Sequence, residues 1–336
     1  MEIVEIFTLE TNRLKQFPSY LLVMSFLSRN SWTSDDMPDL QKKNVIVTGA
    51  NSGIGFEACR KFAEKNAHVV MACRSLEKGK EAKQKIEKEN DSADLEVRKL
   101  DLADLSSVRE FAEEFKTNND KLDILCNNAG IMAIPRQETE DGFEKQFGVN
   151  HLGHFALTAE LIPVLKESEE GRIVTQSSGL HEKGSINFDD LMMEKEYDKW
   201  DAYANSKLAN VLFAYELQRK LEKHDLDIKS VVCHPGYAST NLQYKGPEEE
   251  GSKLKLLGMK IANGLIAQSA ENGSLPMLYA SVAEEIEGGE YVGPNGLANM
   301  RGYPEIQDSS EESKDEDVAE ALWTRSESLT GISYSF

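Results

Sequence analysis

A tyrosine and a lysine four positions apart are the first residues in this chain that could carry proton transfer. Tyr203 and Lys207 lie in a segment that we expect to be helical, Trp200–Leu221, so the two side chains face the same way. A phenol has an unperturbed pKa of about 10 and exchanges protons poorly at neutral pH. A nearby ammonium group favours the phenolate and lowers that pKa. An aromatic ring packed on a lysine stem is the alternative explanation of the pair.

Two more polar residues could serve the same chemistry. Ser178 follows an expected strand, Arg172–Gln176, and could equally be a turn or cap residue. Asn150 lies in an expected helix, Phe143–Leu165, where asparagine is mildly unfavourable unless it is solvated or has a task. Each residue alone is weak evidence. The order of a glycine-rich loop, an asparagine, a serine and Tyr-x-x-x-Lys along one chain is a far more specific pattern.

The glycine-rich stretch Thr48–Gly55 could hold a phosphate. It follows the apolar run Val45-Ile46-Val47 and precedes a pattern with helical spacing, so it reads as strand, turn and helix. Glycines let the backbone turn sharply and approach a pyrophosphate, which then lies at a helix N-terminus. The spacing here is Gly-x-x-x-Gly-x-Gly. Plain turn chemistry also produces such loops.

The elements that position these residues alternate regularly. Short apolar runs separated by helical patterns predict a single Rossmann-type α/β domain, a doubly wound parallel sheet with helices on both faces. Ligands bind such sheets at the carboxyl ends of the strands, where the candidate residues would share one rim. The expected strands are Val45–Val47, His68–Cys73, Leu95–Leu100, Leu122–Cys126, Arg172–Gln176, Ile228–Cys233 and Tyr291–Val292.

Composition limits the possible partners and compartment. The chain of 336 residues has a formal net charge of −20, which argues against nucleic acid or an anionic membrane surface as a partner. Its four cysteines form no Cys-x-x-Cys pair, so we expect free thiols in the reducing cytoplasm, without disulfides or a zinc site. His151 and His154 lack a nearby carboxylate motif, and we interpret them as helix-packing or surface residues rather than metal ligands.

The chain divides into three regions. Residues 1–36 are expected to be a poorly ordered extension, or a product of a start codon placed before Met24 or Met37. Their apolar segment Phe17–Leu27 is too short to span a bilayer, so no membrane anchor is evident. Residues 37–304 form the nucleotide-binding domain, with an insertion at 241–265. Residues 305–336 combine an acidic segment, expected to be solvated, with a closing helix.

These motifs resemble the short-chain dehydrogenase/reductase family in its single-domain form, from about Trp32 to the C-terminus. Within it the chain is similar to retinol-dehydrogenase-like and related microbial oxidoreductases. The residues after Tyr203 are Ala204-Asn205 rather than the Cys-His common in retinol dehydrogenases, which argues against a retinoid substrate. The family resemblance rests on Thr48–Gly55, Asn127–Gly130, Asn150, Ser178, Tyr203–Lys207 and Pro235-Gly236, and the branch on Ala72–Arg74, Asn150–Phe155, Ser206–Asn210 and His234–Gly236.

The resemblance implies a role for each candidate. Tyr203 would be the general acid/base, and Lys207 would lower its pKa and hold the nicotinamide ribose. Ser178 would bind the substrate oxygen, and Asn150 would anchor a water that passes protons to Lys207. The cofactor would be held by Gly49, Asn51, Ser52, Gly53, Ile54, Gly55, Arg74, Asp101, Leu102, Asn128, Ala129, Gly130, Tyr203, Lys207, Pro235, Gly236 and Thr240.

The end of the second strand indicates which nicotinamide cofactor is used. NAD-preferring relatives usually carry an acidic residue there for the ribose 2′-hydroxyl, whereas this chain has Cys73 followed by Arg74. An arginine can pair with a 2′-phosphate that a carboxylate would repel. We therefore expect NADP(H) rather than NAD(H). A plain surface charge is the alternative explanation of Arg74.

The leading hypothesis is an NADP(H)-dependent oxidoreductase that interconverts an alcohol and a carbonyl compound. A non-catalytic NADP(H)-binding regulator on the same fold is the alternative, and a sugar-nucleotide epimerase ranks below both. Loops around Pro135, Gly179–Asp198 and Asn241–Leu265 would shape the substrate site. Their apolar residues indicate either a lipophilic carbonyl substrate or packing of the lid. The resemblance also suggests a homodimer or homotetramer.

Overall fold

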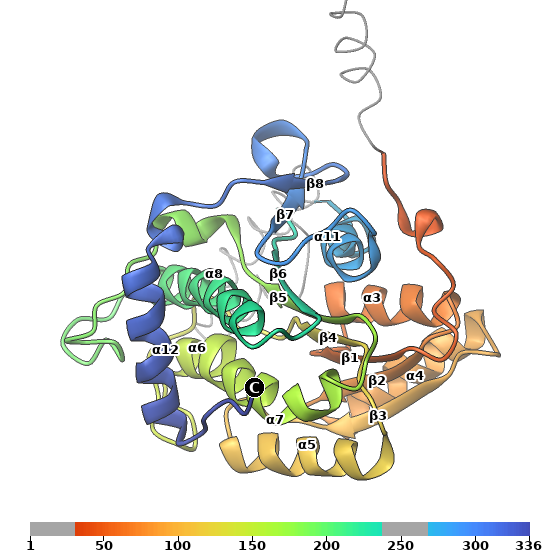
Figure 1. Ribbon diagram of the computed structural model, residues 1–336, viewed down its shortest axis with the longest axis horizontal. Coiled ribbons are helices and arrows are strands. Elements are labelled where there is room, and N and C mark those ends of the chain that lie inside the picture. Colours follow the sequence, from red (N-terminus) through yellow and green to blue (C-terminus); the bar gives the residue numbers. More distant parts are fainter. Residues whose placement is uncertain (1–30, 237–267) are drawn as a thin grey trace, which may run out of the picture. The chain divides into compact units, whose positions relative to one another are not determined.

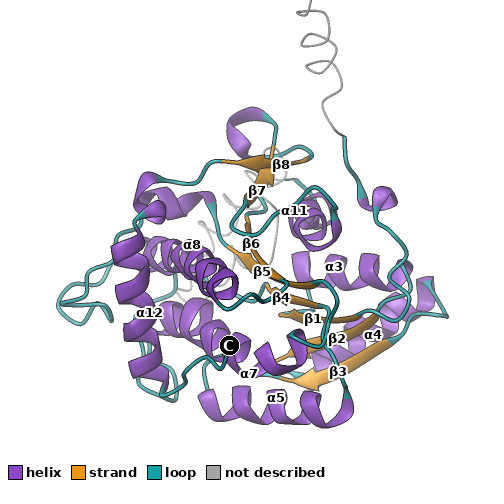
Figure 2. Ribbon diagram, viewed as in Figure 1, coloured by secondary structure: helices purple, strands orange, loops and turns teal. Residues whose placement is uncertain are grey.

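The computed structural model describes residues 31–236 and 268–336. Residues 33–336 belong to one compact unit, and the description below concerns that unit alone. Most of the N-terminal extension, the insertion 241–265 and Thr240 lie outside the described residues. An eight-stranded sheet with the order β3-β2-β1-β4-β5-β6-β7-β8 forms the centre of the unit, as Figures 1 and 2 show.

The strands confirm the expected α/β architecture and add one element. All neighbouring pairs are parallel except β7 and β8, which run antiparallel with Tyr291 opposite Gln307. The chain order reverses between β1 and β4, which places a switch point there. The strands are β1 Asn44–Thr48, β2 His68–Cys73, β3 Leu95–Lys99, β4 Ile124–Asn127, β5 Gly171–Gln176, β6 Ile228–Cys233, β7 Tyr291–Pro294 and β8 Pro304–Gln307.

The carboxylates of the acidic segment are exposed as expected, but the segment also contains a strand and buried serines that the sequence pattern did not predict. Strand β8 begins at Pro304 and pairs with β7, although its sequence lacks the apolar alternation that marks a strand. As an edge strand it needs only one hydrogen-bonded neighbour and can keep polar side chains outward. Ser309 and Ser313, just beyond it, are 8% and 1% exposed.

Helices cover both faces of the sheet, as Figure 1 shows. Helices α3, α4 and α11 lie on one face, and α5, α7 and α8 lie on the other, with α12 packed outside α8. Within the described residues, no helix is long and apolar enough to cross a membrane. The helices are α3 Gly53–Glu64, α4 Leu76–Glu89, α5 Leu105–Asn118, α6 Lys145–Phe147, α7 Gly153–Leu165, α8 Lys199–Lys223, α11 Ala270–Val282 and α12 Glu316–Thr330; short 3₁₀ turns are η1 Ser34–Asp36, η3 Gly179–Lys183, η4 Leu297–Asn299 and η5 Glu311–Lys314.

Side-chain caps explain where several helices begin. Asp104 accepts hydrogen bonds from the backbone N–H groups of Ser106 and Ser107 in the first turn of α5. Asp198 and Asp315 do the same for α8 and α12, and Ser75 caps α4. Each cap satisfies backbone N–H groups that have no partner inside the helix.

The helix expected over Phe143–Leu165 is not uniform. Between α6 and α7 the chain forms one π-helical turn, η2, over Gly148–Leu152. A π turn takes in one more residue than an α turn, and it changes the direction of the side chains on it. Asn150 lies on this turn, so the structure places it by a local irregularity that helical periodicity does not reveal.

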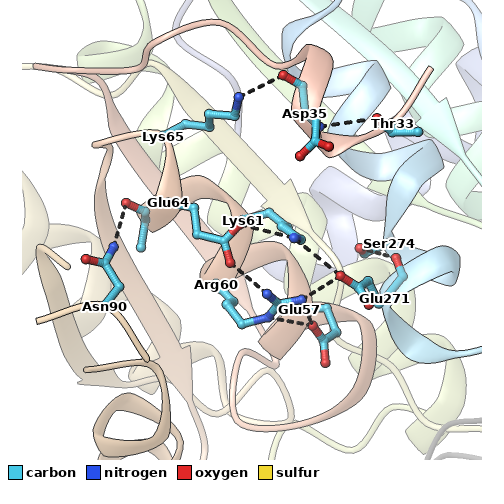
Figure 3. A network of polar contacts seen from close by, with 11 residues as sticks. Thr33, Asp35, Glu57, Arg60, Lys61, Glu64, Lys65, Asn90, Glu271 and Ser274 are labelled. Carbon is cyan, nitrogen blue, oxygen red and sulfur yellow. Dashed lines mark hydrogen bonds and ion pairs between the residues drawn. The ribbon is translucent and has the colours of Figure 1, made fainter. Parts of the chain in front are cut away.

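An ionic network joins α3 to α11 on one face of the sheet (Figure 3). Arg60 lies 2.8 Å from Glu271 and also contacts Glu57 and Glu64 of its own helix. Lys61 reaches Glu271 at 3.3 Å. A network of this kind orients two helices better than an isolated surface pair, although its solvent exposure keeps its energy modest. It fixes α3, whose N-terminus follows the glycine-rich turn.

An aromatic cluster docks the C-terminal helix against α7 and α8. Trp323 of α12 is 4% exposed, and its ring centroid lies 5.1 Å from that of Phe155 and 5.9 Å from that of Phe213. The hydroxyl of Tyr334 donates to the Phe155 carbonyl at 2.8 Å. The C-terminal helix is therefore part of the core rather than an appendage.

Replacing Trp323 by alanine should lower the free energy of unfolding by about 3–5 kcal/mol, because a large buried ring is lost and leaves a cavity. Urea denaturation measures this change. The matched control is Trp200→Ala, since Trp200 is 46% exposed and its loss should cost no more than about 0.5 kcal/mol. Equal costs for the two variants would show that α12 contributes no core packing.

Candidate active site

The turn after β1 has no room for side chains at its glycines. Gly49 has a φ of +68°, and a Cβ placed on it would lie 3.0 Å from the Ala129 Cα. A Cβ on Gly55 would lie 2.5 Å from the Asn128 Nδ2 and 2.7 Å from the Gly49 carbonyl oxygen. The two segments that follow β1 and β4 therefore meet backbone to backbone at the switch point.

A buried hydroxyl group joins those two segments. Thr48 ends β1 and is fully buried, and its Oγ1 accepts hydrogen bonds from the backbone N–H groups of Asn128 and Ala129, both at 2.9 Å. The Asn128 side chain returns a bond from Nδ2 to the Thr48 carbonyl at 2.6 Å. This network satisfies buried polar groups of both strand ends and holds the two turns in register.

His154 of α7 connects the same hydroxyl to Asn150. Its Nδ1 donates to the Asn150 carbonyl at 3.0 Å, and its Nε2 lies 2.9 Å from the Thr48 Oγ1. Since a carbonyl only accepts, the proton is on Nδ1, and Nε2 accepts from the threonine. Burial lowers the pKa of His154 to about 4, which keeps the ring neutral. His151 is also buried and bonds Ser326, so both histidines pack inside the fold.

The Asn150 side chain ties the loop after β4 to helix α8. Its Oδ1 accepts from the Ile131 N–H at 2.8 Å, and its Nδ2 donates to the Ile131 carbonyl at 3.0 Å and to the Ser206 Oγ at 2.9 Å. Ser206 in turn donates to the Tyr203 carbonyl at 2.7 Å. Asn150 thus fixes the turn of α8 that carries Tyr203.

The four residues singled out for chemistry converge. Tyr203 is 5% exposed, and the Ser178 side chain lies near its hydroxyl, where it acts to lower the tyrosine pKa. The Nζ of Lys207 lies 5.8 Å from the centroid of the tyrosine ring. A Cβ placed on Gly130 would lie 3.2 Å from the Asn150 Oδ1 and 3.6 Å from the Lys207 Nζ. The loop after β4 therefore borders both Asn150 and Lys207.

Burial governs the protonation of this site. It raises the pKa of Tyr203 to about 12, against a smaller lowering by the hydrogen bond with Ser178. It also lowers the pKa of Lys207 to about 8. The tyrosine pKa thus moves opposite to the direction expected from the sequence. Lys207 lies over the ring and donates to the Gln176 carbonyl at 3.0 Å, so desolvation outweighs its effect on the phenol.

Comparison with known proteins identifies the family. The family model described as short chain dehydrogenase matches residues 43–251. Human retinol dehydrogenase 13 is 41% identical over 294 residues, covering 86% of this chain and 85% of the human protein. Human retinol dehydrogenase 14 is 39% identical over 305 residues, covering 86% of this chain and 87% of its own.

The chain belongs to the short-chain dehydrogenase family. It is accordingly an oxidoreductase for alcohol and carbonyl groups and is similar to retinol dehydrogenases. A crystal structure of an uncharacterised protein from Mycobacterium paratuberculosis superimposes with a TM-score of 0.76 at 39% identity, covering 91% of this chain and all of that one. The similarity thus extends through most of the described fold.

The expected cofactor residues of this short-chain dehydrogenase lie at the carboxyl ends of the strands. Arg74 is exposed directly after β2, and its side chain has no ion pair or hydrogen bond within the described residues. Asp101 is half-buried and caps the next turn by accepting from the Ala103 N–H at 3.0 Å. The Leu102 side chain packs in the core, so only its backbone faces that rim. The Pro235 carbonyl accepts from Gln268.

Sequence reasoning missed several residues that position this dehydrogenase site. Their polar side chains lie in the right stretches, but only their burial and partners reveal what they do. Gln176 is the clearest case, since its carbonyl accepts from both Lys207 and Asn210 at 3.0 Å and so anchors α8 to the end of β5. The missed residues are Thr48, His154, Gln176, His181, Ser206 and Asn210.

Lys207→Met should remove a pH-dependent cost of folding. Because the folded chain holds the Lys207 pKa at about 8 against an ordinary 10.5, the unfolded chain binds that proton more tightly. The wild type should therefore gain stability relative to the variant as pH rises from 8 to 10.5, by up to about 1.4 kcal/mol per pH unit. Urea denaturation of both proteins at about pH 7 and about pH 9.5 tests this. A stability difference that does not change with pH would contradict it.

Proposed function

We propose that this dehydrogenase uses NADP(H) and that Tyr203 is its general acid/base. The observation that carries the proposal is the convergence of Ser178 on the buried Tyr203 hydroxyl, with Lys207 over the same ring. Two hydroxyl groups from different elements could then meet one substrate oxygen. A regulator that only binds a nucleotide would not need that pair.

The residues at the rim fit a dinucleotide. The Asn128 side chain and the Gly49 carbonyl fill the space beside Gly55, so α3 can begin close against the turn only with glycine there. The Ser52 side chain makes no hydrogen bond as the N-cap of α3, so its hydroxyl is not engaged by the helix. Gly49, Ser52 and Gly55 would hold the pyrophosphate at the N-terminus of α3. Asn128 and Ala129 would border the adenosine ribose.

Arg74 supports NADP(H) over NAD(H). It is exposed after β2 with no partner among the described side chains, and a guanidinium fits a phosphate bidentately. Two proteins that share the fold, from Shigella flexneri and Escherichia coli, were solved with NADP and with NADPH at 21% and 22% identity. We extend that cofactor to this chain because of Arg74.

The mechanism assigns one task to each side chain. When bound, the nicotinamide supplies or accepts the hydride. Tyr203, whose raised pKa keeps it protonated at neutral pH, donates its proton to the carbonyl oxygen during reduction. Ser178 donates a hydrogen bond to the same oxygen. Lys207 would hold the nicotinamide ribose and, with a pKa of about 8, could return a proton towards the tyrosine.

We propose an aldehyde or ketone with an apolar body as the substrate, by extension from the retinol dehydrogenases that this chain resembles. The described apolar loop residues Leu191 and Met192 pack against the core, so packing accounts for them without a ligand. The likeness to retinol dehydrogenases makes retinal one candidate. Ala204 and Asn205 argue against retinal, because retinol dehydrogenases commonly have Cys-His at these two positions. A panel of aldehydes, ketones, quinones and retinal, assayed by loss of NADPH absorbance at about 340 nm, identifies the substrate class.

All four cysteines are free and buried, which supports a cytoplasmic location.

Tyr203→Phe should reduce turnover by at least about 100-fold, because it removes the proton donor and the proton-transfer step is worth roughly that much. NADPH affinity, measured by fluorescence titration, should change little. Tyr279→Phe, which removes a tyrosine hydroxyl on α11, is the control and should remain active. Full turnover in the Tyr203 variant would exclude the mechanism.

Arg74→Asp should lower the ratio of kcat/KM for NADPH to that for NADH by about 10-fold or more, since a charge-assisted phosphate contact is worth roughly 1.5–3 kcal/mol. Steady-state kinetics with both cofactors measures the ratio. Arg325→Asp makes the same charge change at an exposed position on α12 and should leave the ratio unaltered. An unchanged ratio in the first variant would mean that Arg74 does not select the cofactor.

A further inference from the structure

The carbonyl of Ser178 is held by two donors from one residue. The backbone N–H of His181 donates to it at 3.0 Å, and the His181 Nδ1 donates at 2.8 Å. His181 lies in η3 and is 1% exposed. Ser178 is the N-cap of the same turn, and its Oγ also accepts from the Leu180 N–H at 3.2 Å. The direction of the serine hydroxyl is thus fixed through η3.

The other nitrogen of His181 faces the C-terminal segment. Its Nε2 accepts from the Ser310 N–H at 3.1 Å. With Nδ1 donating and Nε2 accepting, the ring is the neutral Nδ1–H tautomer, and burial lowers its pKa in agreement with that state. Figure 1 shows the blue chain leaving β8 and passing beside the green segment ahead of α8. This ring therefore joins Ser178 to a segment over 130 residues away in sequence.

The segment that His181 contacts is itself docked on α8. The hydroxyls of Tyr215 and Ser309 lie 2.8 Å apart, and Ser313 donates to the Ser309 Oγ at 2.7 Å. Helix α8 also carries Tyr203. The segment 309–313 thus spans the two elements that supply the serine and the tyrosine of the proposed site.

A stack of rings extends this support towards the cofactor side. Tyr291 of β7 lies between His181 and His234, with ring centroids 5.2 Å and 5.3 Å away. The Tyr291 hydroxyl lies 3.2 Å from the His181 Nδ1. The Gly236 N–H donates to the His234 Nδ1 at 3.3 Å, and the His234 Nε2 donates to Gln307 at 3.2 Å. The loop after β6 and the end of β8 therefore share one buried support with Ser178.

We propose that His181 is a positioning residue for Ser178 and that its other ring nitrogen tethers the C-terminal segment 309–313 to η3. The inference rests on the proposed function, because it assigns Ser178 to the substrate oxygen. His181 touches no reacting atom. It holds the Ser178 peptide through Nδ1 and its backbone N–H, and it binds the segment separately through Nε2 and Ser310. Without the Nδ1 donor, the Ser178 carbonyl keeps only the hydrogen bond from the His181 backbone N–H. The serine hydroxyl can then turn away from Tyr203.

Three variants separate positioning from general packing. His181→Asn keeps an amide donor close to the place of Nδ1 but lacks an acceptor at the place of Nε2. His181→Gln carries its amide further out, near the place of Nε2. His181→Ala has neither group. His68→Ala is the control, because His68 pairs with Asp94 at the start of β2, away from the rim.

We expect kcat to fall about 10-fold or more in His181→Ala and His181→Gln and to stay within about threefold of wild type in His181→Asn, since one buried hydrogen bond is worth roughly a factor of ten. NADPH affinity should stay within about twofold in all three, because the pyrophosphate turn does not touch His181. Equal losses of kcat in the three variants, or an unchanged kcat in His181→Ala while Tyr203→Phe is inactive, would overturn the proposal.

Hydrogen exchange keeps the two hypotheses distinguishable. Peptides covering 177–184 should exchange faster only in the Ala and Gln variants, whereas those covering 309–314 should exchange faster in the Ala and Asn variants. This exchange pattern can be measured without a substrate. A wild type that fails to oxidise NADPH with any carbonyl compound of the panel would therefore refute the proposed function and leave the positioning role standing. Uniform faster exchange in all three variants, or none in any, would refute the positioning role.

Discussion

The buried hydroxyl of Thr48 is the contact on which the arrangement of the site depends. It accepts two backbone N–H groups from the turn after β4, and it pairs with His154, which holds the carbonyl of Asn150. Three segments far apart in the sequence thus meet at one oxygen. A buried hydroxyl that lost one of these partners would bear a desolvation cost of about 1–3 kcal/mol, so the geometry is strongly favoured. The glycine-rich turn and the proton-transfer residues are held in one frame through this atom.

Desolvation shapes the chemistry within that frame. In water the tyrosine and lysine would titrate almost together, with ordinary pKa values of 10.0 and 10.5. In the fold their pKa values are about 12 and about 8, so the lysine loses its proton first. Each residue is pushed towards its neutral form because burial penalises charge. At neutral pH the phenol is therefore a proton donor, and the amine is close to giving up a proton, a combination suited to passing protons between them.

The chain from β8 to the C-terminus packs around the site although it carries none of the residues on which the family resemblance rests. Strand β8 extends the sheet, Trp323 closes the aromatic cluster over α7 and α8, and Ser310 contacts His181. The contacts of Trp323 and Ser310 join residues more than 100 positions apart, so they produce no local signal. The acidic composition of the segment suggested solvation. Its small hydroxyl residues, Ser309, Ser310 and Ser313, nevertheless turn inward while its carboxylates remain outside.

The sequence by itself determined the fold class, the strand positions and the family. Strand periodicity is local, and Tyr203, Lys207 and the glycine spacing are recognisable because their chemistry requires those residue types. Only the tertiary structure decided the π turn at Asn150, the strand β8 and the partners of His154 and His181. It also reversed the expected direction of the tyrosine pKa. Burial and hydrogen bonds between distant segments set these features, and both arise only when the sheet brings the strand ends together.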